Sequence, residues 1–276
     1  MIWKDKLEYY QRKYFSKDLT IPYKLKCGCE LNIYPILAKE WDLFEECLDI
    51  VLIDKNSIND ANIISMSYLE FLKEIRFNIK EELQPNYTFG DNELNKFKQF
   101  FSICMKEDYV FIEKIKDKYN VIVGEKDKQG DLILKATITN KEFQEISKIV
   151  LFQNIKNYDD RKLDPEVQKI YNDYISLKQQ DIHQPTFEEK LDYVLGITGY
   201  KIDELMNMTY RRFDGIFDSM VNRDEYIATK IIEASEKFKC DKTSIYFLYQ
   251  KKKDKYADFI QDPQSLRNKI DGINNN

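Results

Sequence analysis

Cys27 and Cys29 flank a single glycine, and this tripeptide is the most reactive-looking element of the sequence. Two thiols at this spacing can bind a soft metal ion or form a strained disulfide. The other three cysteines are scattered along the chain, so no second pair completes a zinc site. The alternation of Leu25, Cys27, Cys29 and Leu31 also allows both thiols to point inward as small apolar groups. We favour this structural role, and a redox or metal role stays open.

The chain contains one histidine, His183, in a polar segment before Gln184 and Pro185. Mechanisms that need a histidine pair, or a metal site built on several histidines, are therefore excluded within one chain. Glycine-rich phosphate-binding loops, the nucleophile elbow and the zinc-protease helix motif do not occur either. We interpret His183 as a solvated linker residue and predict a protein that is not an enzyme and needs no cofactor or metal.

Tyr210, Arg211 and Arg212 are the most concentrated candidate for a protein-binding site. Tyrosine and arginine are enriched where protein surfaces bind tightly. Because these residues lie at an expected helix start, the two arginines could also contact phosphate. In the structural alternative, Phe213 belongs to the core and both arginines pair with acidic neighbours. Those neighbours are Asp203, Glu204 and Asp214.

The overall charge argues against broad attraction to nucleic acid. The 276 residues carry a net charge of -5 and the pI is about 5.3, whereas nucleic-acid binding normally needs a basic face. A local basic patch is still allowed. The five cysteines are an odd number without an export signal, which indicates reduced thiols. The apolar runs are too short to cross a bilayer, so we expect a cytoplasmic protein.

Hydrophobic periodicity predicts the elements that carry these residues. Residues 21–36 alternate as a β-hairpin that turns near Cys27 and Gly28. Three β-rich segments follow in the middle of the chain, and a helix capped by Thr139 or Asn140 should cover the small sheet that they form. Those strands are expected at 109–115, 119–124 and 132–138. Other helices are expected at 2–15, 41–51, 60–80, 92–104 and after Pro165.

The clearest helical pattern lies in residues 185–238. Thr186 and Glu189 match a capping box, and Gly196 or Gly199 can end the helix that begins there. A short helix over 202–207 leads to a long helix that Thr209 can cap. The buried face predicted for the long helix consists of Phe213, Ile216, Phe217, Met220, Ile227 and Ile231.

These patterns predict an α+β fold that is predominantly helical. Residues 1–106 should form an N-terminal β-hairpin with helices. Residues 107–155 should form a small central antiparallel sheet with one covering helix. Residues 156–276 should form a C-terminal helical domain that ends in a frayed tail.

The order of these motifs resembles tail-morphogenesis proteins of contractile-tailed bacteriophages. The likeness rests on TNKEFQEISKIVLFQN after the central hairpin, on PTFEEKLDYVLGITGYKIDELMNMTYRRF, and on the long helix that follows. It covers the chain well from about Tyr109 onward. The resemblance implies a tail assembly chaperone or, alternatively, a structural component of the baseplate or tail, with no catalytic residue.

The same resemblance implies partners and a location. The partners would be other tail or baseplate proteins, with the tape-measure protein as one candidate. The protein would act in the cytoplasm of the bacterial host, or be built into the phage particle. The alternative from a different class is a regulatory module of a phage or mobile element that binds nucleic acid through the helix carrying Arg211 and Arg212.

Overall fold

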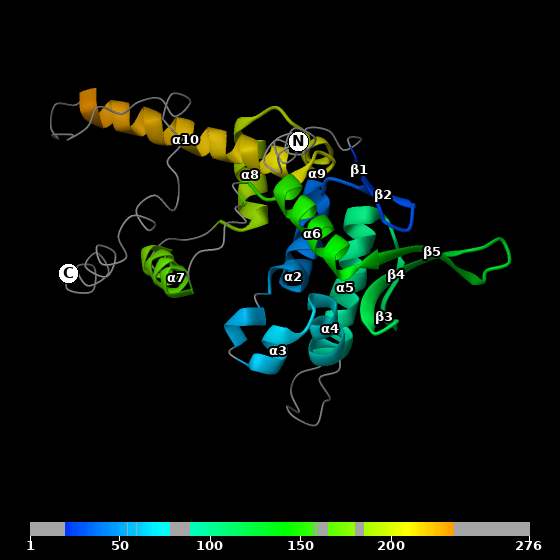
Figure 1. Ribbon diagram of the computed structural model, residues 1–276. Helices are drawn as coiled ribbons and strands as arrows, with labels where there is room; N and C mark the ends of the chain where they lie inside the picture. Colours follow the sequence, from blue (N-terminus) through cyan, green and yellow to red (C-terminus); the bar gives the residue numbers. More distant parts are fainter. Residues whose placement is uncertain are drawn as a thin grey trace. The chain divides into compact units, whose positions relative to one another are not determined.

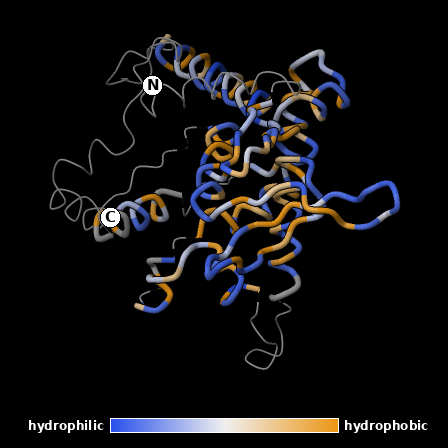
Figure 2. Tube along the Cα trace, turned by 45° about the vertical axis from the view of Figure 1, so that its right-hand side comes forward, coloured by the Kyte–Doolittle hydropathy of each residue, from blue (hydrophilic) through white to orange (hydrophobic). Residues whose placement is uncertain are grey.

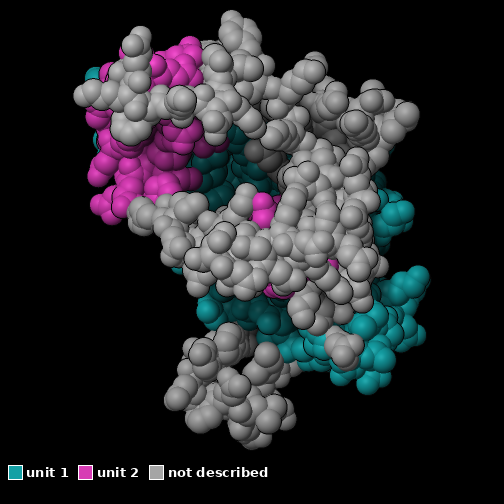
Figure 3. Space-filling view, turned by 90° about the vertical axis from the view of Figure 1, so that its left-hand side faces the viewer, with its two compact units in different colours: residues 1–158, 200–215 teal, residues 159–199, 216–276 magenta. Residues whose placement is uncertain are grey.

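The structure is a computed structural model, and its elements confirm an α+β fold in which helices predominate. It describes residues 20–53, 55–58, 60–77, 89–156, 158, 165–179 and 185–234. The chain divides into a first unit of residues 1–158 and 200–215 and a second unit of residues 159–199 and 216–276 (Figure 3). The predicted helix over 2–15 and His183 lie outside the described residues.

The boundaries of these units can be compared with the three predicted regions. The boundary expected between residues 155 and 156 lies close to the point where the chain leaves the first unit. The boundary expected between residues 106 and 107 falls inside the first unit, whose buried apolar residues form one cluster across it. Residues 200–215 return the chain to the first unit.

The first unit begins with the predicted hairpin, in which β1 (Ile21–Lys24) pairs with β2 (Glu30–Ile33) in antiparallel register. Its turn lies where the sequence predicts it. The Gly28 N–H donates to the Leu25 carbonyl at 3.0 Å, and the Leu25 N–H donates to the Cys29 carbonyl at 2.8 Å. Gly28 has a φ of 91°, a conformation that glycine adopts without steric cost.

The helix predicted over residues 60–80 is wrong as a single element. The chain forms α3 (Ala61–Ser65), α4 (Tyr68–Phe71) and the π-helical turn η4 (Leu72–Arg76). Met66 is extended, and Ser67 and Glu70 then build a new capping box. The spacing S-x-x-E at residues 67–70 was the local signal for this break.

The remaining helical elements of the first unit follow the predicted spacing more closely. Helix α2 buries Phe44, Cys47 and Ile50 against the core. Helix α5 buries the aromatic side chains of its last three turns. The bounds are η2 (Ala38–Glu40), α2 (Trp41–Leu52), η3 (Lys55–Ile58), α5 (Phe89–Met105) and α9 (Ile202–Met206).

A three-stranded antiparallel sheet has the order β3 (Tyr109–Ile115), β4 (Lys118–Lys126) and β5 (Leu132–Thr139). Strands β4 and β5 continue beyond the end of β3 as an arm, here called the β4–β5 arm, of residues 125–134 (Figure 1). The tip of this arm is hydrophilic, whereas the strands at its base are largely hydrophobic (Figure 2). Helix α6 (Asn140–Asn154) follows directly, capped by Thr139.

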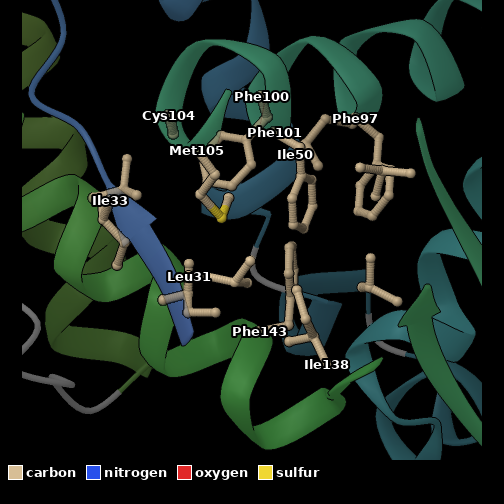
Figure 4. Packing of buried hydrophobic residues seen from close by; sticks show 14 of the residues in the cluster. Leu31, Ile33, Ile50, Phe97, Phe100, Phe101, Cys104, Met105, Ile138 and Phe143 are labelled. Carbon is tan, nitrogen blue, oxygen red and sulfur yellow. The ribbon is translucent and has the colours of Figure 1, made fainter. Parts of the chain in front are cut away.

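Phe143 of α6 lies at the centre of the first unit's core. Its ring is 5.9 Å from that of Phe97, 6.4 Å from that of Phe100 and 6.0 Å from that of Phe101, measured between centroids (Figure 4). Aromatic rings at these separations attract one another beyond the gain from burial. This cluster fixes α5 and α6 together, and the sheet packs against both helices.

The second unit contains α7 (Pro165–Gln179), α8 (Phe187–Ile197) and the greater part of α10 (Tyr210–Ala234). The predicted capping box is confirmed, since the Thr186 N–H donates to Glu189 Oε2 at 2.8 Å and the Glu189 N–H donates to Thr186 Oγ1 at 3.2 Å. Helix α8 contacts α10 through Tyr193, whose ring lies 5.6 Å from that of Phe217.

The buried face predicted for α10 is only partly correct. Phe213 is fully buried, but Ile227 and Ile231 are 41% and 65% exposed. The described contacts of α8 with α10 reach Asp224, which accepts a hydrogen bond from the Tyr193 hydroxyl, and both isoleucines lie beyond that point. Helical spacing identifies an apolar stripe, but a second element must cover the stripe before it is buried.

Candidate functional site

Tyr210, the first of the predicted binding residues, is part of the packed interior. Its side chain is 6% exposed, and its ring stacks on that of Trp41 with centroids 3.5 Å apart and planes 9° apart. The backbone holds this position, because the Tyr210 N–H donates to the Ile36 carbonyl at 2.7 Å and the Ala38 N–H donates to the Met208 carbonyl at 2.9 Å. The phenol ring is therefore not available as a contact surface.

Arg211 is also engaged within the first unit. Its guanidinium Nη1 donates to the backbone carbonyls of Phe152 and Gln153, at the C-terminal end of α6. A helix C-terminus carries carbonyls without intrahelical partners and a partial negative charge, so a cation binds there favourably. Both of these partners are backbone carbonyls, whereas the sequence suggested acidic side chains. The burial of Phe213 is as the structural alternative predicts.

Arg212 is the one member of the predicted triplet whose side chain is exposed. The structure thus places the three neighbouring residues in three environments: a buried stack, a helix end and the surface. This separation follows from their positions on α10, because consecutive helical residues point in directions about 100° apart. The triplet does not form one continuous binding surface.

A surface that the sequence analysis did not single out lies on the β4–β5 arm. Leu132, Ile133 and Leu134 are 51%, 43% and 65% exposed. They are consecutive on β5, which is an edge strand of its sheet. Neighbouring residues of a strand point to opposite faces, so apolar groups are exposed on both faces of the arm. The run LIL directly after a hydrophilic turn was the available sequence signal.

The expectation that both thiols point inward is wrong for Cys27, whereas Cys29 packs against the edge of the core. Cys27 is exposed at the tight turn around Gly28, and Cys29, on the other side of that glycine, is half-buried. The Cys29 Sγ donates to the Lys135 carbonyl of β5 at 3.3 Å. The two thiols are also close enough for each to shift the pKa of the other.

The pKa values of the two thiols are shifted in opposite directions. Partial burial raises the pKa of the Cys27 thiol, but hydrogen bonds from the backbone at Thr137 and Cys29 and from the Cys29 side chain outweigh it, so the net pKa is lowered. The pKa of Cys29 is raised, chiefly by its hydrogen bond with Cys27. By contrast, burial raises the pKa of Cys47 to about 12. Cys27 is therefore the most acidic of these three thiols.

A pocket of about 440 Å³ lies between the hairpin turn, α4, β4 and the start of α6. Three lysines line it, Lys26, Lys118 and Lys141, together with Glu70 and Asp117. Ser67 and Thr139, which also line it, accept hydrogen bonds from the helix backbones that they cap. Capping thus accounts for both hydroxyls, and the pocket offers a mixed-charge surface rather than an arrangement of nucleophile and base.

Two findings bound the chemistry of the described residues. Within the part of the chain that the structure describes, no three or more His, Cys, Asp or Glu side chains are grouped so that they could hold a metal ion. None of the helices in that part is both long enough and apolar enough to cross a membrane.

A scan against protein-family models finds no match, and searches of the curated proteins and of the solved structures return no significant match.

Proposed function

We propose that this chain is a non-enzymatic assembly factor of a bacteriophage tail or baseplate that acts by binding other tail proteins. The proposal combines the resemblance of its sequence to tail-morphogenesis proteins with one structural observation. That observation is the exposed apolar run Leu132–Leu134 on an edge strand. It replaces Tyr210, Arg211 and Arg212 as the candidate contact surface, because Tyr210 and Arg211 are engaged inside the first unit.

An exposed apolar edge strand favours pairing with another polypeptide. The free backbone groups of an edge can accept an added strand, and the flanking side chains then bind the partner's apolar groups. The occupant that fits the β4–β5 arm is an extended segment of a tail protein with alternating apolar residues. Its side chains would cover Leu132 and Leu134 on one face and Ile133 on the other.

Binding measurements on purified tail and baseplate proteins of the same genome test this proposal. Ile133→Lys and Leu134→Lys place a charge on the arm at exposed positions, so the thermal unfolding temperature should not change. We expect each variant to weaken binding of its partner at least about tenfold. Ile64→Lys is the matched control, because Ile64 is 42% exposed on α3, away from the sheet. Equal affinities of all three variants would reject the arm as the contact surface.

Mass spectrometry of intact phage particles separates the two forms of the proposal. An assembly chaperone is absent from purified particles, whereas a structural component is present at fixed stoichiometry. The nucleic-acid alternative has its own test. Retention on duplex DNA that depends on salt and disappears on Arg212→Ala would favour that alternative over the assembly proposal.

A further inference from the structure

The hairpin turn brings two thiols together on the surface of the first unit. Cys27 and Cys29 are adjacent to the one glycine of the turn, and the φ of 91° at Gly28 reverses the chain between them. Their side chains are close enough for each thiol to shift the pKa of the other. Cys47 and Cys104, in contrast, are fully buried in the core. Of these four cysteines, only Cys27 and Cys29 are neighbours with side chains that solvent can reach.

The same pair contacts the edge of the central sheet. The Cys29 S–H donates to the Lys135 carbonyl at 3.3 Å. The backbone at Thr137, two residues farther along β5, is close enough to Cys27 to lower the pKa of its thiol. Because backbone groups two residues apart point to the same side of a strand, both thiols lie along the edge of β5.

We propose that Cys27–Gly28–Cys29 is a thiol-modification site that exchanges with small-molecule disulfides and closes a reversible disulfide between Cys27 and Cys29. The geometry assigns the two sulfurs different roles. Cys27 is the more exposed, so its sulfur attacks first, and Cys29 is the resolving thiol. This inference is independent of the proposed assembly function.

The exchange balances as two successive displacements. The Cys27 thiolate attacks one sulfur of the small disulfide RSSR, which forms a Cys27–SR bond and releases one RS⁻. The Cys29 sulfur, after losing its proton, attacks the Cys27 sulfur and releases the second RS⁻. The two released thiolates take up the two cysteine protons, so two thiols are oxidised and RSSR is reduced to two RSH.

Closure of the disulfide would change the contact with β5. The oxidised pair has no S–H, so the Lys135 carbonyl loses the donor that it has in the dithiol state. The ring that closes through Gly28 is small, and strained or exposed disulfides are readily reduced. We therefore expect a bond that forms and breaks with the thiol balance of the solution rather than a permanent crosslink.

Peptide mapping of the full-length protein tests the proposal directly. The protein is equilibrated in mixtures of reduced and oxidised glutathione, quenched with acid, alkylated and digested with trypsin. Cleavage after Lys26 and Lys39 releases one peptide, residues 27–39, that contains both thiols. We expect this peptide to be doubly alkylated in reducing mixtures. In oxidising mixtures it should be unalkylated and lighter by two hydrogen atoms, and reduced glutathione should reverse the change.

Single substitutions distinguish the attacking thiol, Cys27, from the resolving thiol, Cys29. Cys27 is exposed, so Cys27→Ser should unfold like the parent chain, and Cys29→Ser, at a half-buried position, should remain folded. Cys29→Ser should accumulate one glutathione on Cys27, and Cys27→Ser should react several times more slowly. The proposal is overturned if peptide 27–39 stays reduced in every mixture. It is also overturned if each cysteine takes up glutathione separately and no internal bond forms.

Discussion

The rings of Trp41 and Tyr210 stack face to face, with centroids 3.5 Å apart and planes 9° apart. Trp41 is the first residue of α2 and Tyr210 is the first residue of α10, so the stack joins the starts of two helices that are far apart in sequence. Backbone hydrogen bonds between residues 36–38 and residues 208–210 reinforce it. This contact anchors the start of α10 in the first unit.

A double-mutant cycle should detect the stack. We expect Trp41→Ala and Tyr210→Ala each to lower the free energy of unfolding by about 3–5 kcal/mol, the usual range for aromatic truncations in a core, with the half-buried Trp41 at the lower end. The double variant should lose less than the sum of the two by about 0.5–1.5 kcal/mol, which is the coupling between stacked rings. Urea unfolding measures all four proteins, and strict additivity would show that the rings do not interact.

Arg211 and Arg212 offer a matched pair of neighbouring arginines. Arg211→Ala should lower the free energy of unfolding by about 1–3 kcal/mol, because the carbonyls of Phe152 and Gln153 lose a charged donor. Arg212→Ala should change it by less than about 0.5 kcal/mol, since its side chain is exposed. Thermal unfolding of both variants checks this, and equal effects would contradict the assignment of Arg211 to the end of α6.

Substitution by alanine should lower the stability of the protein at Gly28 and raise it at Gly215. A Cβ at either position meets no atom within 4 Å, so the backbone alone decides the outcome. Gly28 has a positive φ, and Gly28→Ala should destabilise the protein by about 1–2 kcal/mol. Gly215 lies inside α10, where Gly215→Ala should stabilise the first unit by about 0.5–1 kcal/mol. Destabilisation by Gly215→Ala would contradict a continuous helix at that position.

Glu142 should make stability depend on pH. Its carboxylate accepts hydrogen bonds from the Thr139 hydroxyl at 2.6 Å, the Lys26 N–H at 2.7 Å and the Thr139 N–H at 2.9 Å. Burial raises the pKa of Glu142, but these hydrogen bonds outweigh it and hold the pKa below its ordinary value of 4.5. A folded-state pKa below the unfolded one means that ionised Glu142 stabilises the fold above about pH 4.5, and that this contribution is lost as the pH falls through the folded pKa.

Glu142→Gln tests whether ionised Glu142 stabilises the fold. At neutral pH it should cost about 1–3 kcal/mol, because an amide nitrogen cannot accept the bonds that one carboxylate oxygen accepts. The difference from the parent chain should shrink as the pH falls below the ordinary carboxyl pKa. Glu113→Gln, at an exposed position of β3, is the control and should show little change at any pH. Urea unfolding across the acid range measures the stability of both variants. If the stability difference between Glu142→Gln and the parent chain grew on acidification, the pKa of Glu142 would not be lowered in the folded state.

The local structure of this protein follows from interactions between residues that are close in sequence. Thr139 with Glu142 and Thr186 with Glu189 satisfy helix ends that lie within three residues of them. The turn at Gly28 likewise depends only on the residues beside it. Capping and turn formation are short-range interactions, so residue type and spacing suffice to predict them. The same rule would have divided the helix expected over 60–80, since Ser67 and Glu70 carry the signal.

Whether a side chain is buried or exposed depends, in contrast, on how distant elements pack together. Tyr210 is buried because Trp41 stacks on it, and Arg211 binds the end of α6, a helix that precedes it by more than fifty residues. Ile231 follows the same apolar stripe as Phe213 but is 65% exposed, and Leu134 on the β4–β5 arm is also 65% exposed. Burial depends on elements that are distant in sequence, and the spacing of residues along one element does not contain that information.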